Sequence, residues 1–162
     1  MEAYPYRKSI RLKNYDYRSN GVYHVTICTQ NHKCLFGTVV NGEMILSEVG
    51  WTAYHNAQLI AQHYPEVQLI EFVIMPNHAH LLLVLVTQAD ANYGVPTAVH
   101  SLGQIVRAYK ASVSRVYGSS IWQPRFYEHI IRGKRDYLDT IAYIQNNPAS
   151  WNKDDYYLPS DP

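Results

Sequence analysis

The alternation of apolar and polar positions along the chain predicts a protein built from both strands and helices. Strand-like patterns occupy 21–30, a hairpin at 35–47, and then 67–75, 78–86 and 126–132. Helical spacing, with apolar residues three or four positions apart, occupies 48–64, 101–118 and 134–147. This order of elements predicts an α+β fold, in which helices pack on one face of a ferredoxin-like antiparallel sheet.

Single residues refine these segments. Alternation places three apolar residues on one face of the first strand: Tyr23, Val25 and Ile27. Asn41 and Gly42 form the pair that is preferred in a type I′ hairpin turn. The buried face expected for helix 48–64 consists of Trp51, Tyr54, Leu59, Ile60 and His63. The next helix has a capping serine, Ser101, and a terminating glycine, Gly118. Its apolar stripe consists of Leu102, Ile105, Val106, Tyr109 and Val113.

The composition is that of one globular domain, which we take as residues 1–162 with a basic N-terminal segment at 1–20. A chain of this length can bury a core without disulfides. Cys28 and Cys34 are too few for a disulfide framework, and together with His32 they make an incomplete zinc set. No signal peptide and no apolar run of membrane length occurs, so we expect a cytoplasmic protein with no membrane partner.

A formal net charge of +1 conceals two basic blocks. The first contains Arg7, Lys8, Arg11, Lys13 and Arg18, and the second contains Arg107, Lys110, Arg115, Arg125, Arg132, Lys134 and Arg135. These blocks fit either one phosphate-binding face or an ordinary solvated surface. The chain also has 15 tyrosines, and aromatic rings beside cations suit stacking on unpaired bases.

Two histidines stand in the apolar run MPNHAHLL at 75–82. After the turn signal at Pro76 and Asn77, a strand would point His78 and His80 to the same side, about 7 Å apart along the backbone. Two neutral imidazoles at this spacing fit a metal site. They equally fit two hydrogen-bonded histidines in a half-buried sheet, and the spacing alone leaves both interpretations open.

The last helix carries a second polar pair. Tyr143 and Asn147 are four residues apart, so they lie on one helix face. The amide oxygen of Asn147 would complete a site of two imidazoles and one amide, which suits Mn²⁺ or Mg²⁺. A phosphodiester bound there would then lie within reach of the Tyr143 hydroxyl. In the alternative, Tyr143 is a core residue and Asn147 only ends the helix before Pro148.

Three motifs in sequence order resemble the single-tyrosine HUH transposases, and specifically the REP-associated tyrosine transposases. They are PNHAH at 76–80, WQPRFYEHIIR at 122–132 and DYLDTIAYIQNNP at 136–148, and the opening stretches SIRLKNYDY and YHVTICTQN are similar to this family too. The resemblance extends from Arg7 to Trp151. In HUH the letters stand for histidine, hydrophobic residue, histidine, here His78, Ala79 and His80.

The resemblance implies an HUH endonuclease palm and a metal-dependent cleavage of hairpin-containing single-stranded DNA. It implies that Tyr143 is the nucleophile, that the DNA becomes joined to it by a 5′-phosphotyrosine bond, and that a free 3′-OH is released. It assigns His78, His80 and Asn147 as ligands of Mg²⁺ or Mn²⁺, although Gln145 and Asn146 also offer amides.

We expect DNA contacts from one group of basic residues: Arg7, Arg11, Arg107, Lys110, Arg125 and Arg132. The resemblance implies a prokaryotic protein associated with the nucleoid. It leaves open a homodimer or a monomer, because related enzymes include both. A single-stranded nucleic-acid-binding protein without catalytic activity is the alternative function. The remaining histidines, among them His24 and His129, are expected to be surface or hydrogen-bonded residues.

Overall fold

A computed structural model describes residues 21–86 and 100–159 of the chain. The strands are β1 (Gly21–Cys28), β2 (Gly37–Val40), β3 (Glu43–Leu46), β4 (Val67–Met75), β5 (His78–Leu85) and β6 (Tyr127–Ile130). The helices are α1 (Glu48–His63), α2 (Leu102–Tyr117) and α3 (Gly133–Asn146), with 3₁₀ turns η1 (Gln30–His32) and η2 (Pro148–Lys153). All segments expected from the sequence form, with ends shifted by a few residues.

The main sheet has the strand order β4-β5-β1-β6, and each neighbouring pair is antiparallel. A strand–helix–strand unit, β1-α1-β4, is thus split by the insertion of β5, as in ferredoxin-like folds. This confirms the α+β, antiparallel class. The separate hairpin β2-β3 turns at Asn41 and Gly42, whose φ angles of 52° and 78° are those of the expected type I′ turn.

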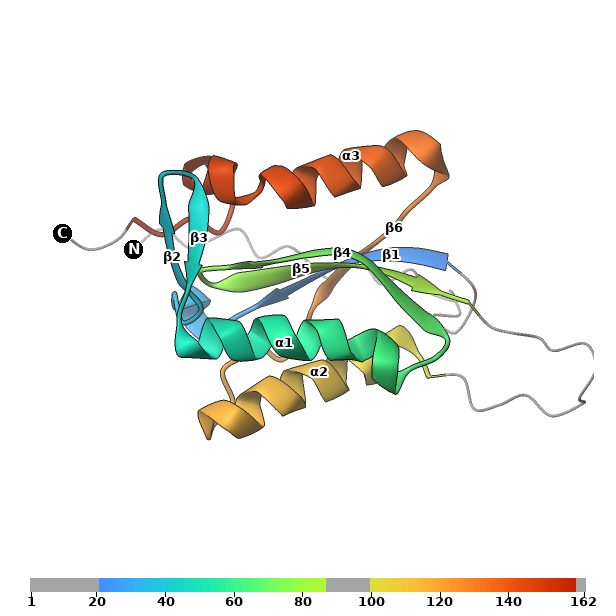
Figure 1. Ribbon diagram of the computed structural model, residues 1–162, viewed down its shortest axis with the longest axis horizontal. Coiled ribbons are helices and arrows are strands. Elements are labelled where there is room, and N and C mark those ends of the chain that lie inside the picture. The colour runs from blue at the N-terminus through green and yellow to red at the C-terminus, as the bar shows by residue number, and fades with distance from the viewer. Residues whose placement is uncertain (1–20, 87–99, 160–162) are drawn as a thin grey trace, which may run out of the picture.

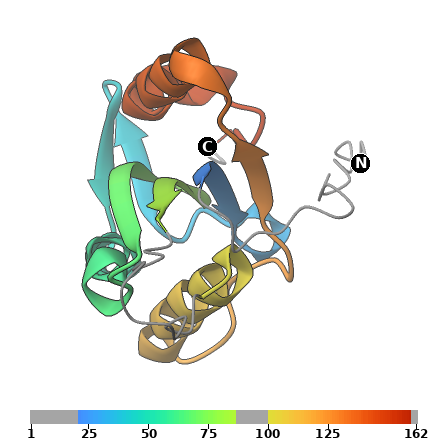
Figure 2. The same cartoon turned by 90° about the vertical axis from the view of Figure 1, so that its right-hand side faces the viewer.

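The two faces of the sheet have different partners. Helices α1 and α2 lie together on one face, whereas α3 crosses the opposite face (Figure 1; Figure 2 shows the three layers from the side). The expectation that all helices pack on one face is therefore wrong for α3. Apolar periodicity shows that a helix has a buried side, but it does not show which face of a sheet that side covers.

The hydrophobic core fills the space between the sheet and the pair α1-α2. Alternate residues of the two central strands enter it: Tyr23, Val25 and Ile27 from β1, and Ala79, Leu81, Leu83 and Leu85 from β5. The expected stripe of α2, from Leu102 to Val113, is buried completely. A capping box of Ser101 and Gln104 begins α2, and Gly118 in the left-handed region (φ 94°) ends it.

The buried side of α1 differs from the expected one. Ile60 is buried as expected, but the other buried residues are the small Gly50, Ala53 and Ala57, while Trp51 is 50% exposed. Gly50 explains this orientation, because a Cβ atom there would lie 2.0 Å from the backbone oxygen of Phe36. Close backbone packing therefore selects the small-residue face over the aromatic one. Among the described residues, no helix is both long and apolar enough to cross a membrane.

Candidate active site

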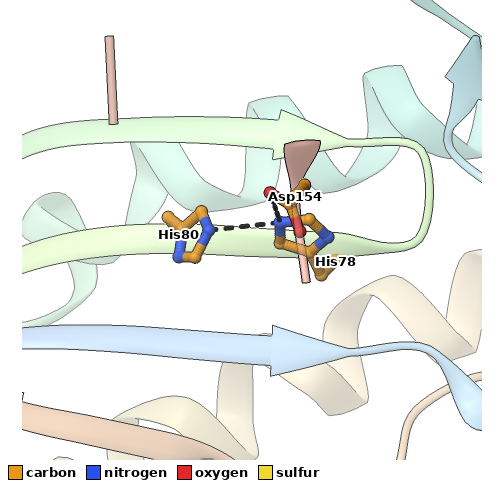
Figure 3. A group of neighbouring side chains, drawn as sticks. All are labelled: His78, His80 and Asp154. Carbon is orange, nitrogen blue, oxygen red and sulfur yellow. Dashed lines mark hydrogen bonds and ion pairs between the residues drawn. The ribbon is translucent and has the colours of Figure 1, made fainter. Parts of the chain in front are cut away.

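His78 and His80 lie on the face of β5 that α3 covers. Register with β1 places His80 opposite Thr26 and His78 opposite Cys28. Both side chains are buried, and their Nε2 atoms are 3.1 Å apart. Figure 3 shows the two rings pointing toward one another from the same strand. The local sequence causes this arrangement, because the tight β4-β5 turn at Pro76 and Asn77 starts the alternation at His78.

Burial sets the protonation of both rings. Desolvation lowers the pKa of His78 to about 3, and the Asn147 side chain opposes that shift only in part. Desolvation, followed by the neighbouring rings of His78 and His24, lowers the pKa of His80 well below its usual value. Both imidazoles are therefore neutral at physiological pH, which is the form that binds metal ions.

Asp154 is the third group at this position, and sequence analysis missed it. It follows η2 and places Oδ2 3.7 Å from His78 Nε2, with its side chain 1% exposed (Figure 3). The ligand atoms of His78, His80 and Asp154 all lie within 4.8 Å of one another. Asp154 lies in a segment without helical or strand periodicity, so no sequence pattern indicated it.

Asn147 lies beside this group at the end of α3. Its Nδ2 donates to Asp154 Oδ2 at 3.0 Å, and its buried Oδ1 has no hydrogen-bond partner among the residues that the structure describes. The other two amides are exposed, and Gln145 donates instead to Glu71. Of the three amides left open by the sequence, Asn147 is thus the one that the structure brings to the histidine pair.

The donor set suits a hard or borderline divalent cation. Ligand atoms about 2.1 Å from an octahedral cation lie about 3 Å apart when adjacent and about 4.2 Å apart when opposite. The separations of 3.1 Å and 3.7 Å need only small adjustment to match. A buried amide oxygen without a partner is costly unless something binds it, so the orphaned Asn147 Oδ1 also fits a metal ligand.

Tyr143 stands over the histidine pair. Its ring lies edge-on to His80 with the ring centroids 5.3 Å apart, and it also contacts His24 at 5.9 Å. The side chain is 47% exposed, so solvent and ligands reach it. Because α3 packs on β4 of the same chain, the tyrosine and the histidines meet within a single copy.

His24 is the remaining histidine of the cluster. Its Nε2 is 3.0 Å from His80 Nδ1, and Thr26 Oγ1 is equally close to that atom. Burial, and then the charge of His129, lowers the pKa of His24 to about 4, while Asp136 opposes this. His129 itself bonds to Asp136 at 2.9 Å. The expectation that these two histidines are hydrogen-bonded holds, but the sequence did not indicate that His24 supports His80.

The basic residues of the second block divide between two places. Arg107, Lys110 and Arg125 line one pocket of about 700 Å³ beside the start of α2, whereas Arg132 is the residue before α3. Lys110 donates from Nζ to the Gln123 backbone oxygen at 2.6 Å, and burial lowers its pKa. The two N-terminal candidates, Arg7 and Arg11, fall outside the described residues.

The two cysteines and His32 do not form a second metal site. Cys28 is buried, and burial raises the pKa of its thiol to about 12, while Cys34 is exposed. Within 21–86 and 100–159, the group of His78, His80 and Asp154 has metal-ligand geometry and the pair of cysteines with His32 does not.

Comparison with known proteins adds sequence and fold relationships. The model of the family described as "Transposase IS200 like" matches residues 17–147. An uncharacterized Haemophilus influenzae protein is 38% identical over 171 residues, covering 94% of each chain. A second Haemophilus influenzae protein, provisionally named a REP-associated tyrosine transposase, is 30% identical over 85% of this chain and 77% of its own length.

The fold is also found among solved structures. A REP-associated tyrosine transposase bound to a REP hairpin superposes with a TM-score of 0.58, covering 80% of this chain and 67% of the other, at 23% identity. At this identity the likeness concerns the fold.

Proposed function

Because the chain belongs to the IS200-like transposase family, with REP-associated tyrosine transposases among its relatives, we propose that it cleaves and rejoins single-stranded DNA. In this proposal Tyr143 is the nucleophile and a divalent metal ion is required. One observation carries it: within one chain, the exposed Tyr143 lies against His80 of a buried, neutral histidine pair.

The metal would be held by His78, His80 and Asn147, with Asp154 beside them. A Mg²⁺ or Mn²⁺ ion held by these residues would supply Lewis-acid stabilisation of a bound phosphodiester. The chain's own contribution is to keep both imidazoles neutral by burial and to fix the Asn147 amide through Asp154. It also keeps the two histidines together on the rigid central strand β5 of the sheet.

Tyr143 would attack the phosphorus of the scissile phosphate. The Tyr143 oxygen loses its proton and forms a new bond to phosphorus. The bond between phosphorus and the 3′ oxygen breaks, and the 3′ oxygen takes up a proton to become the 3′-OH. The number of phosphate ester bonds is unchanged, so the reverse reaction rejoins DNA without a nucleotide cofactor. Tyrosine is protonated at neutral pH, with a reference pKa of about 10, and therefore depends on the cation to stabilise the attacked phosphate.

The basic pocket beside α2 is the proposed contact for a DNA hairpin, since the solved relative holds a REP hairpin. Arg107 and Arg125 would bind its phosphates. From this pocket β6 leads along the sheet edge to Arg132 at the start of α3 (Figure 1). A single-stranded flank following that edge would pass from the α2 face to the α3 face, where Tyr143 lies.

We propose that a monomer is competent for cleavage, with Tyr143 acting in cis. Two contacts within one chain support this: the Tyr143 ring lies against His80, and Gln145 of α3 donates to Glu71 of β4 at 2.9 Å.

A covalent-trapping experiment tests the proposal. A single-stranded hairpin substrate with Mn²⁺ should give a protein–DNA band that survives denaturing gels, and mass spectrometry should place the 5′-phosphate on Tyr143. Tyr143→Phe should bind the DNA and yield no band, while the matched Tyr137→Phe, on the same helix, should behave as the wild type. DNA binding without metal-dependent cleavage would instead favour the alternative, a non-catalytic single-strand-binding protein.

A further inference from the structure

Asn77 is the buried residue before His78. Hydrogen bonds at both the nitrogen and the oxygen of its side-chain amide fix the orientation of that amide. Its Nδ2 donates to the backbone oxygens of Tyr156 at 2.7 Å and His32 at 3.2 Å. Carbonyl oxygens only accept, so the atom facing them must be the NH₂ group. The oxygen Oδ1 is therefore the atom that lies 2.8 Å from His78 Nδ1.

This orientation determines the tautomer of His78. A side-chain amide oxygen only accepts, so Nδ1 of His78 must carry a hydrogen. In a neutral ring the other nitrogen, Nε2, then has its lone pair free. That lone pair faces His80 Nε2 at 3.1 Å and Asp154 at 3.7 Å. We infer that Asn77 is a positioning residue that locks His78 in its metal-binding tautomer before any metal arrives.

His80 is not locked in the same way. Two lone pairs facing each other across 3.1 Å would repel, so in the metal-free protein His80 Nε2 carries the hydrogen and donates to His78. Its Nδ1 then accepts from Thr26 or His24, both 3.0 Å away. A hydroxyl and an imidazole can each donate or accept. His80 can therefore change tautomer when a cation takes the place of its Nε2 hydrogen, whereas Asn77 prevents His78 from doing so.

Imidazole nitrogen NMR on the metal-free protein tests this directly. The long-range ¹H–¹⁵N spectrum should show His78 protonated at Nδ1 and His80 protonated at Nε2. With Zn²⁺ as a diamagnetic probe, His80 should change to the Nδ1–H form and His78 should keep its tautomer. A wild-type His78 protonated at Nε2 would overturn the inference, whatever the variants below do.

Two variants separate tautomer control from simple anchoring. Asn77→Ala removes the acceptor and should mix the His78 tautomers, with Zn²⁺ affinity falling about 10- to 100-fold, the usual loss when the support of a ligand is removed. Asn77→Asp keeps an acceptor toward Nδ1 but loses both donations to the carbonyls. It should melt at a lower temperature while keeping the tautomer, and because it adds a negative charge near the cation, its Zn²⁺ affinity should not fall below that of the wild type. If both variants lost the same Zn²⁺ affinity, Asn77 would only anchor the turn to the two backbone carbonyls. Its proposed role in fixing the tautomer of His78 would then be refuted.

Thr29→Val is the matched control, because it removes the 3.0 Å bond to the Asn77 backbone oxygen in the same turn without touching either ring. It should leave both tautomers unchanged. The inference rests on the proposed function only for the identity of the bound ion. If no DNA is cleaved but the tautomers are as stated, the proposed function fails alone; if Tyr143 forms its adduct while His78 is protonated at Nε2, this inference fails alone.

Discussion

Replacing Asp154 by asparagine should weaken metal binding strongly and leave the metal-free fold intact. The change removes one negative charge and keeps the shape of the side chain. Asn147 Nδ2 donates to Oδ2 of the carboxylate, whereas the Tyr156 backbone N–H donates to Oδ1, so the single oxygen of the new amide can keep only one of these two bonds. With that oxygen in the Oδ2 position Asn147 stays oriented, and the variant removes the charge together with the bond from Tyr156.

The distance sets the size of the effect. A carboxylate oxygen and a dication separated by about 3.7 Å, the spacing of Asp154 Oδ2 from His78 Nε2, attract by about 2 kcal/mol even at the dielectric constant of water. This corresponds to a loss of affinity of roughly 30- to 40-fold, and the low dielectric of the buried site increases it. Among the described residues the carboxylate has no lysine or arginine partner, so in the metal-free protein the loss of the buried charge should offset the loss of one hydrogen bond, and the melting temperature should change little.

Mn²⁺ titration followed by electron paramagnetic resonance measures the affinity, and a thermal melt checks the fold. Asp155→Asn is the matched control: it makes the same chemical change one residue away at an exposed position, and it should bind Mn²⁺ like the wild type. An Asp154→Asn variant with wild-type affinity would refute the assignment of Asp154 to the metal site and leave it only as a support for Asn147.

Four further outcomes follow from the same geometry. His80→Ala, or chelation of the metal with EDTA, should abolish cleavage, assayed on a labelled hairpin oligonucleotide, while the fold remains intact by circular dichroism. The free energy of unfolding without metal should fall as pH drops from 6.5 to 4, since the unfolded state then binds protons that the buried His24, His78 and His80 do not bind in the folded state. The shift of the His24 pKa from 6.5 to about 4 alone corresponds to about 3 kcal/mol, measurable by urea titration, and a flat profile would contradict it. Arg107→Ala and Arg125→Ala should each flatten the salt dependence of hairpin binding by about one unit, and Lys110→Ala should do so less, because its ammonium group already bonds to Gln123. Light scattering combined with a concentration series should show cleavage by a monomer, whereas activity that requires a dimer would contradict the assembly of the site within one chain.

Periodic features of the chain were predictable from the sequence, and irregular ones were not. The alternation around His78 and His80 gave their common face, and the four-residue step gave the pairing of Tyr143 with Asn147, because both follow from regular backbone geometry. Asp154 was missed because it belongs to the irregular chain after η2, where no repeat relates residue number to direction.

Two packing features also needed the structure. The burial of Gly50 in place of Trp51 depends on how closely α1 approaches the Phe36 backbone, which is a tertiary contact. The position of α3 depends on which sheet face remains uncovered. Helix α3 buries only Thr140 and Ile144, so its sequence pattern resembles that of a weakly packed surface helix.

The two faces of strand β5 have different roles. Residues 79, 81, 83 and 85 supply the core beneath α1 and α2, whereas 78 and 80 supply the proposed metal ligands beneath α3. Substitutions at one set leave the other set in place, so stability and reactivity can evolve separately here. Insertions and deletions have the opposite effect. One residue gained or lost in β5 would turn imidazoles toward the core and leucines toward the tyrosine, and would abolish both properties at once.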